Sequence, residues 1–267
     1  MIHESLSTIP ETGMGCMVFE FIATGFGQGA RKPIAALSTA PMGSMKFVAG
    51  GSNPERAGFF ARFGHCEASV PKLSLQHSRT VHFPDDACGD IPRRAAGESA
   101  IDWIRADGIV AKDIDRALAV TVADCMPIWV FDESSGYFGV LHSGWKGTGI
   151  LSSAIEGICS RTRSDPSSIS VILGPAIGSC CYSVPEERVD VFAREFGEET
   201  VLRERGVFRL DLRRANTILA RRAGVGALLS VEVCTSCETR LGSYRRQGPA
   251  DFTRMAAICC HIKEETR

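Results

Sequence analysis

The middle of the chain carries the clearest alternation between hydrophobic and polar segments. Residues 117–122 and 127–131 are apolar runs rich in β-branched and aromatic side chains, and residues 136–141 follow a Ser-Ser-Gly turn. Short apolar runs between turn residues are typical of buried strands. Residues 144–163 instead repeat apolar side chains at helical spacing, which predicts a helix that ends before an Asp-Pro pair. Residues 169–173 predict a further buried strand.

The C-terminal third alternates between helical and strand patterns. Residues 185–196 predict a helix with proline in its first turn, and residues 212–223 predict an amphipathic helix that ends at Gly224. Strands are predicted at residues 207–210, 228–233 and 255–262.

The N-terminal third is less regular. Residues 18–22 predict a short strand, residues 25–30 a glycine-rich turn, and residues 54–63 a helix capped by Asn53 or Ser52. The first 16 residues predict a disordered tail, and residues 17–267 a single domain. Because some strands follow one another directly while others alternate with helices, the pattern favours an α+β (mixed α/β) fold of mixed sheets flanked by helices.

Composition places the chain among globular proteins. Of its 267 residues, 44% are hydrophobic and 23% charged, with a formal net charge of −1. This balance argues against nucleic acid as a partner. The most apolar stretch, residues 117–131, contains Asp124 and is shorter than the roughly 20 residues of a membrane span, so no membrane partner is predicted. Eleven cysteines without an expected secretory signal indicate reduced thiols and a cytoplasmic location. The oligomeric state is left open.

Two candidate metal ligands follow apolar strands. Cys125 and His142 offer the sulfur and nitrogen donors that zinc or copper binds, but they stand 17 positions apart, so a third ligand must come from elsewhere. His77 and His82 are the candidates for it. By composition alone, structural roles for all of these residues are favoured.

Two other segments contain groups suited to ligand binding. Residues 173–182 form a strand followed by a Gly/Pro loop, whose backbone N–H groups can face a ligand. Arg245 and Arg246 stand beside Tyr244, a combination that can pair with phosphate and stack on a base. The alternatives, a structural turn and a solvated basic patch, are favoured when these segments are considered alone.

Four segments together resemble a known family. Residues 121–127 (TVADCMP), 141–147 (LHSGWKG), 173–182 (LGPAIGSCCY) and 243–246 (SYRR) occur in the order found in the multicopper polyphenol oxidoreductase (laccase) family, whose members are also described as purine nucleoside phosphorylases. Cys234-Thr235 also matches. The resemblance covers about 70% of the chain, from residue 73 onward.

The resemblance implies one single-domain fold and one catalytic zinc bound by His77, Cys125 and His142. His77 is preferred over His82 because a valine follows it four residues later, as in the family, although its glutamine stands one rather than two residues before it. The sequence does not say which carboxylate acts as general acid or base; Asp124, beside the proposed ligand Cys125, is a candidate catalytic residue and could equally orient a metal-bound histidine.

The resemblance also implies reactions. The family is linked to phosphorolysis of adenosine, inosine and methylthioadenosine, and to adenosine deamination. Purine nucleosides and inorganic phosphate are then the expected partners, with Arg245 and Arg246 as phosphate-binding residues and Tyr182 or Tyr244 stacking on the base. Residues 44–47, 51–52 and 60–62 depart from the family pattern, which predicts altered substrate contacts beside an unchanged metal site.

Two other functions compete with this interpretation. A copper-dependent, laccase-like polyphenol oxidase would carry copper as its cofactor, but six scattered histidines do not suit several copper ions. A cysteine hydrolase acting in peptidoglycan quality control would use Cys125 as nucleophile and His142 as base.

Overall fold

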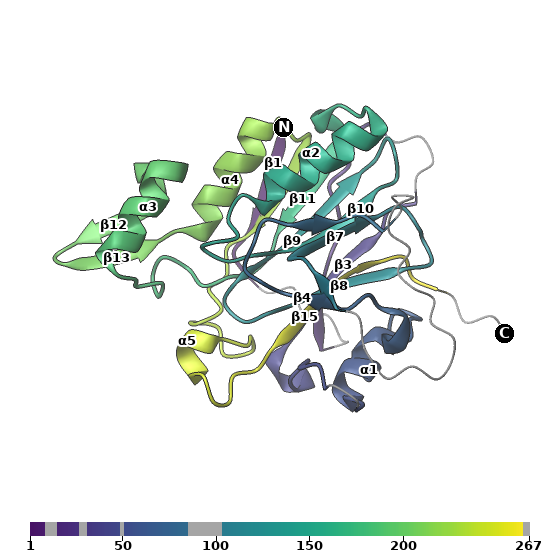
Figure 1. The fold of residues 1–267 in the computed structure, drawn as a ribbon, viewed down its shortest axis with the longest axis horizontal. Helices are drawn as coiled ribbons and strands as arrows, with labels where there is room; N and C mark the ends of the chain where they lie inside the picture. Colours follow the sequence, from purple (N-terminus) through teal and green to yellow (C-terminus); the bar gives the residue numbers. More distant parts are fainter. Residues whose placement is uncertain (9–14, 27–30, 49–50, 85–102, 264–267) are drawn as a thin grey trace.

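The computed structural model describes residues 1–8, 15–26, 31–48, 51–84 and 103–263, and within these residues the strands form two main sheets (Figure 1). The larger sheet has the strand order β1-β14-β11-β9-β10-β7-β5 and the smaller sheet the order β2-β3-β15-β8. The strands of the larger sheet are β1 (Ile2–Leu6), β5 (Val81–His82), β7 (Gly108–Ala111), β9 (Met126–Asp132), β10 (Phe138–Ser143), β11 (Ile169–Leu173) and β14 (Ala227–Val231). Those of the smaller sheet are β2 (Cys16–Phe19), β3 (Ile34–Ser38), β8 (Ala117–Val122) and β15 (Met255–Cys260).

Helices and two short strand pairs complete the described structure. The pairs are β4 (Leu73–Ser74) with β6 (Ile104–Arg105), and β12 (Val201–Glu204) with β13 (Val207–Leu210). The α-helices are α1 (Pro54–Ala61), α2 (Ile150–Thr162), α3 (Glu186–Phe196), α4 (Leu212–Ala223) and α5 (Tyr244–Gln247). Single 3₁₀ turns lie at Ala40–Met42, Glu67–Ser69, Pro166–Ser168 and Glu198–Thr200.

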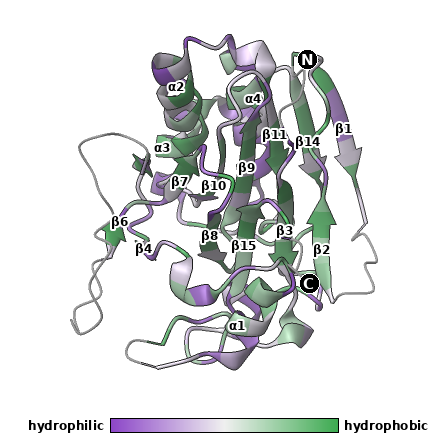
Figure 2. Ribbon diagram, turned by 90° about the vertical axis from the view of Figure 1, so that its right-hand side faces the viewer, coloured by the Kyte–Doolittle hydropathy of each residue, from purple (hydrophilic) through white to green (hydrophobic). Residues whose placement is uncertain are grey.

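The two sheets pack face to face and are covered by helices on both outer faces (Figures 1 and 2). Alternate residues of one strand therefore enter different cores. On β9, Ile128 and Val130 pack toward α2 and α4, whereas Trp129 and Phe131 pack toward the smaller sheet. The Trp129 indole Nε1 donates a hydrogen bond of 2.8 Å to the Ile258 carbonyl of β15, which ties the two sheets together. The mixed fold of sheets flanked by helices is thus confirmed.

The N-terminus differs from the predicted tail. Residues 2–6 form β1, which pairs in parallel with β14 at the edge of the larger sheet. Part of the region expected to be disordered therefore contributes a strand, although its side chains are mostly exposed and give little hydrophobic signal. Residues 9–14 of that expected tail lie outside the described residues, as do residues 27–30 of the expected glycine-rich turn.

Several element boundaries differ from the prediction for local reasons. The helix expected over residues 144–163 begins at Ile150, because Gly149 has a φ of 109° that a right-handed helix excludes. Asn53 caps α1 by accepting from the Arg56 amide, as expected. The strands β3 and β7 were not predicted, since their small residues give no alternating pattern.

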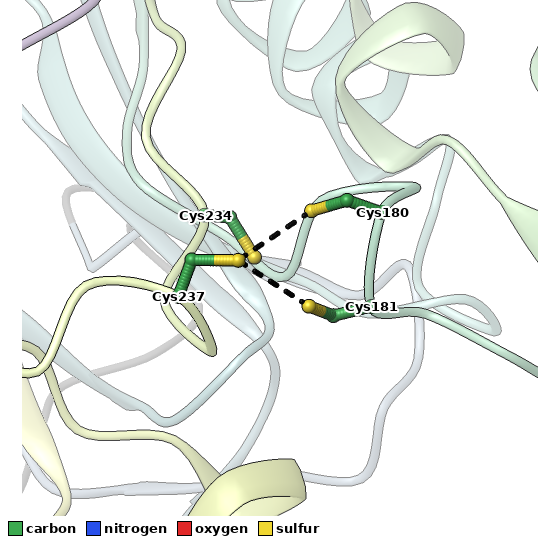
Figure 3. Close-up of side chains that lie close together, drawn as sticks. All are labelled: Cys180, Cys181, Cys234 and Cys237. Atoms are coloured by element: carbon green, nitrogen blue, oxygen red, sulfur yellow. Dashed lines mark hydrogen bonds between the residues drawn. The ribbon is translucent and has the colours of Figure 1, made fainter.

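Two long loops meet beside the carboxyl ends of β11 and β14. Ala176 and Cys234 form an isolated parallel bridge, and the Thr235 amide donates to the Ala176 carbonyl at 3.1 Å. The same approach brings together four cysteine side chains, Cys180 and Cys181 from one loop and Cys234 and Cys237 from the other (Figure 3). These loops contribute to the site described next.

Among the described residues, no helix combines the length and the hydropathy needed to cross a membrane.

Candidate active site

A cavity of about 770 Å³ opens where β8, β10 and β11 end. Cavities of this size suit small organic ligands. Its walls combine aromatic and cationic side chains from several loops, with apolar residues between them. The aromatic residues are Phe47, Trp103, Tyr182, Tyr244 and Phe252, and the cationic residues are Lys46, Arg188, Arg245 and Arg254.

Three side chains that could bind a metal ion line this cavity together. His77 comes from the loop between β4 and β5, Cys125 from the turn between β8 and β9, and His142 from the end of β10. One donor atom from each lies within 4.8 Å of the others. Residues that are far apart in the sequence therefore form one group whose donor types suit a zinc ion. His82 lies on β5, paired with β7, and does not line the cavity.

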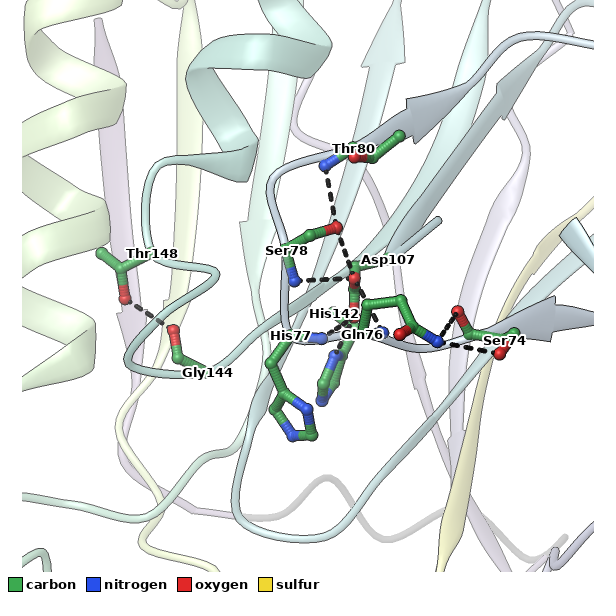
Figure 4. A network of polar contacts seen from close by, with 9 residues as sticks. All are labelled: Ser74, Gln76, His77, Ser78, Thr80, Asp107, His142, Gly144 and Thr148. Carbon is green, nitrogen blue, oxygen red and sulfur yellow. Dashed lines mark hydrogen bonds and ion pairs between the residues drawn. The ribbon is translucent and has the colours of Figure 1, made fainter. Parts of the chain in front are cut away.

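A buried carboxylate, Asp107, supports two of these residues (Figure 4). Its Oδ1 accepts the His77 amide at 2.9 Å and lies 3.0 Å from His142 Nδ1. Its Oδ2 accepts from the Gln76 amide, the Ser78 amide and the Ser78 hydroxyl. Because Asp107 binds Nδ1 of His142, the other ring nitrogen is left to face Cys125 and a metal ion, the arrangement that metal-binding histidines usually have.

The backbone of the site adopts conformations that most residues avoid. His77 has a φ of 56° and Asp124 a φ of 79°, both in the left-handed region. At Asp124 the chain leaves the smaller sheet and enters the larger one within three residues. Gly144 lies against the site, because a Cβ there would be 2.8 Å from Cys125 Sγ and 3.4 Å from His77 Cδ2. The close approach of His77 and Cys125 therefore requires glycine at position 144.

The electrostatics of the group favour a thiolate beside an imidazolium when no metal is bound. Burial raises the pKa of Cys125, but the charge of His142 and hydrogen bonds from both histidines outweigh it and bring that pKa to about 6. Burial lowers the pKa of His142, but Cys125 and Asp107 raise it to about 9. The pKa of Asp107 is held far below its usual range, because its hydrogen bonds outweigh the effect of burial.

Asp124 lies at the cavity, but its carboxylate is already engaged. Oδ1 accepts from the Thr235 hydroxyl and Oδ2 from the Arg245 amide, both at 2.6 Å. Its carbonyl accepts from the Ile177 amide. Asp124 therefore ties together three loops at the site. It does not orient a histidine, as the sequence allowed; Asp107 makes that contact, to His142.

The two neighbouring arginines of the 243–246 segment diverge. The Arg245 guanidinium lines the cavity and donates to the carbonyls of Cys181 and Ser183 at 3.0 and 2.9 Å. The Arg246 guanidinium is not among the lining residues and donates to carbonyl oxygens of its own loop, those of Thr235, Ser236, Glu238 and Leu241. The expected phosphate contact of Arg246 is therefore not supported, and its role is to hold this loop.

Tyr182 and Tyr244 both line the cavity, as a stacking role requires. Burial is the main cause that raises the pKa of Tyr182 to about 12, so its hydroxyl is neutral. Tyr244 packs edge-on against Phe252, with ring centroids 5.0 Å apart, and is 48% exposed. Sequence reasoning missed Arg188, whose guanidinium lies 4.5 Å from the centre of the Trp145 ring while the side chain also reaches Tyr182.

Known proteins resemble this chain in sequence. The family model described as multi-copper polyphenol oxidoreductase laccase matches residues 55–261. The purine nucleoside phosphorylase YlmD of Geobacillus stearothermophilus is 35% identical over 182 residues, covering 64% of this chain and 66% of that protein. The adenosine deaminase RL5 of an unknown prokaryotic organism is 34% identical over 160 residues, covering 57% of this chain and 60% of that protein. The chain thus spans slightly less than two thirds of these relatives.

Solved structures share the fold. The Bacillus licheniformis hypothetical protein YfiH superposes with a TM-score of 0.74 at 25% identity, covering 86% of this chain and 92% of that one. YlmD from Geobacillus stearothermophilus superposes with a TM-score of 0.72 at 25% identity, covering 89% and 99%. Since the family model spans more than half of the sequence, the chain belongs to the multi-copper polyphenol oxidoreductase laccase family.

Proposed function

We propose that this protein is a zinc-dependent purine nucleoside phosphorylase that also deaminates adenosine. The observation that carries the proposal is the group of His77, Cys125 and His142 in a cavity lined by aromatic and cationic residues. Relatives named purine nucleoside phosphorylase and adenosine deaminase support it. One catalytic domain was expected over residues 17–267, and we propose that it also includes β1, because Ile2–Leu6 pairs with β14 in the larger sheet.

The donor set fits a single zinc ion. Two imidazole nitrogens and one thiolate are typical zinc ligands, and three protein ligands leave a fourth position for substrate or water. A zinc ion bound there supplies Lewis acidity beside the cavity. Among the described residues, no other candidate metal-binding group contains histidine, which disfavours a centre of several copper ions. A single copper ion stays the alternative that metal analysis must exclude.

The remaining cavity residues suit a nucleoside and a phosphate. Aromatic side chains such as Tyr182 and Phe47 offer faces for a purine ring. Arg245 uses one N–H of each terminal nitrogen on backbone carbonyls, so its fork is already oriented and keeps further donors. Arg188 adds a second guanidinium from the start of α3. Together the two guanidiniums can hold phosphate next to the glycosidic bond that phosphorolysis breaks.

Product analysis tests the proposal. Purified zinc-loaded protein is incubated with adenosine, inosine or methylthioadenosine, with and without inorganic phosphate. We expect free base and ribose 1-phosphate (methylthioribose 1-phosphate from methylthioadenosine) only when phosphate is present, and inosine from adenosine without it. Oxidation of phenols by copper-loaded protein, with no nucleoside product, would overturn the proposal in favour of the oxidase.

One observation favours a second candidate, a cysteine hydrolase. Cys125, His142 and Asp107 stand in the order of a nucleophile, its base and the group that orients the base. His77 separates the two functions, because a hydrolase of this type has no use for a second histidine on the thiol. If the His77→Ala protein turned over an ester or amide at the wild-type rate without metal, the hydrolase would be the better assignment.

A further inference from the structure

Outside the proposed active site, four cysteines form a second compact group of metal-binding atoms. Cys180 and Cys181 come from the loop after β11, and Cys234 and Cys237 from the loop after β14 (Figure 3). All four Sγ atoms lie within 4.8 Å of one another. The pair 234–237 has the Cys-x-x-Cys spacing that is common in structural zinc sites.

The sulfur spacing suits a shared metal ion better than a disulfide. Zinc–sulfur bonds of about 2.3 Å in a tetrahedron place the sulfur atoms about 3.8 Å apart. The Sγ atom of Cys237 lies 3.8 Å from that of Cys180 and 3.4 Å from that of Cys181. A disulfide would require about 2.05 Å between two of them. The four side chains therefore need only small rotations to surround one ion.

Backbone amides are directed at the sulfur of one of the four cysteines, Cys234. The Gly178 amide donates to Cys234 Sγ at 3.2 Å, and the amides of Ser236 and Cys237 also point at this sulfur. A Cβ at Gly178 would lie 3.2 Å from Cys180 Sγ, so this close approach favours glycine. N–H groups directed at sulfur lower the energy of the charged form, which is the form that binds metal.

Cationic side chains hold the two cysteine loops in place. Arg245 donates to the carbonyls of Cys181 and Ser183 in the first loop, and Arg246 donates to the carbonyls of Thr235 and Ser236 in the second. A zinc ion with four thiolates has a net charge of −2, which neighbouring guanidiniums offset. This arrangement gives Arg246 a structural purpose that the sequence motif did not indicate.

We propose that Cys180, Cys181, Cys234 and Cys237 bind a second zinc ion as a structural tetrathiolate site. Four protein ligands leave no open coordination position, so this ion would take no part in the chemistry. It would instead clamp the loop that carries Tyr182 to the loop that carries Arg245, and so fix both against the cavity. Zinc is chosen over copper or iron because it needs no redox partner and prefers this tetrahedral geometry.

Zinc stoichiometry of the full chain tests the proposal. The protein is loaded with zinc under reducing conditions, freed of excess metal and measured by elemental analysis. We expect two zinc ions per chain for the wild type and one for Cys237→Ser. Cys66→Ser is the matched control, since Cys66 is also exposed but lies outside the group, and it should keep both ions.

The His77→Ala protein keeps the four cysteines intact and provides a second measurement. Loaded with cobalt(II), it should retain one ion with the strong sulfur-to-metal absorption of a tetrathiolate, and this absorption should disappear when Cys237→Ser is added. The proposal is overturned if wild type and Cys237→Ser bind equal amounts of zinc. It is equally overturned if the zinc-free wild type, kept under reducing conditions, carries a disulfide between the two loops, which would assign the group to redox chemistry. Both tests measure metal content and metal absorption, so their outcome does not depend on whether the protein turns over nucleosides.

Discussion

Replacing Asp107 by Asn tests whether this buried carboxylate positions the metal-binding residues. The side chain is fully buried and accepts hydrogen bonds on both oxygens. Oδ1 faces the His77 amide and His142 Nδ1, and Oδ2 faces the Gln76 amide and two donors of Ser78. Asn has the same shape but replaces one of these oxygens with an NH2 group, which is itself a donor.

The magnitude follows from this geometry. Whichever oxygen is replaced, the new NH2 group meets at least two donors, so at least two charge-assisted hydrogen bonds are lost. Each is worth about 1.5–3 kcal/mol, so the free energy of unfolding should fall by about 3 kcal/mol or more, a large part of the roughly 5–15 kcal/mol of a typical domain. Loss of the partner of a metal-binding histidine typically weakens metal binding 10–100-fold, or about 1.4–2.8 kcal/mol.

Asp132→Asn is the matched control. Asp132 is also a fully buried carboxylate with a lowered pKa, but its partners are the hydroxyls of Ser134, Ser135 and Ser168 at the far end of β9. Denaturant unfolding should show both variants destabilised, whereas competition with a chelator should show weaker zinc binding at the active site only for Asp107→Asn. Equal zinc affinity in the two variants would refute the positioning role.

Four further substitutions test the site. His77→Ala should remove the active-site zinc and nucleoside turnover while the fold persists, and His82→Ala should keep both; elemental analysis with the reverse result would reassign the ligand. Gly144→Ala should reduce zinc affinity at least tenfold in a chelator competition, because its Cβ would stand 2.8 Å from Cys125 Sγ, and unchanged affinity would show that the loop yields. Arg245→Lys should lower phosphate-dependent turnover about tenfold or more and deamination less, since lysine lacks the guanidinium fork; equal losses in steady-state assays would mean that it binds the nucleoside.

The buried strands of this fold could be predicted because their apolar runs are long and bounded by turns. β8 and β11 have the predicted boundaries, and every residue of β9 is buried. The edge strand β1 could not be predicted in this way, because its mostly exposed side chains carry no apolar run. Parallel pairing with β14 stabilises it through backbone hydrogen bonds, and these depend on no particular side chain.

In the candidate site, too, some residues could be predicted from local sequence and others could not. Cys125 and His142 stand at the ends of predicted strands and have side chains that bind metal ions, so the sequence alone identifies them as candidate ligands that require a third. Asp107 precedes a glycine and has the local appearance of a turn residue, and only the pairing of β7 with β10 brings it to His142. Arg188 looks like one charge among several in the first turn of α3. Both residues act through long-range contacts that no local pattern encodes.

The adjacent arginines show why a motif that locates a site does not by itself assign roles within it. Successive residues on a helical turn point in directions about 100° apart, so Arg245 and Arg246 cannot serve the same ligand unless it surrounds the helix. The capping of α5 by Ser243, which accepts from the Arg246 amide, fixes that divergence. Asp124 accepts the Arg245 amide and thereby sets where the first guanidinium enters the cavity. The segment 243–246 thus contributes Arg245 to the wall of the cavity and Arg246 to the hydrogen bonds that hold the neighbouring loop in place.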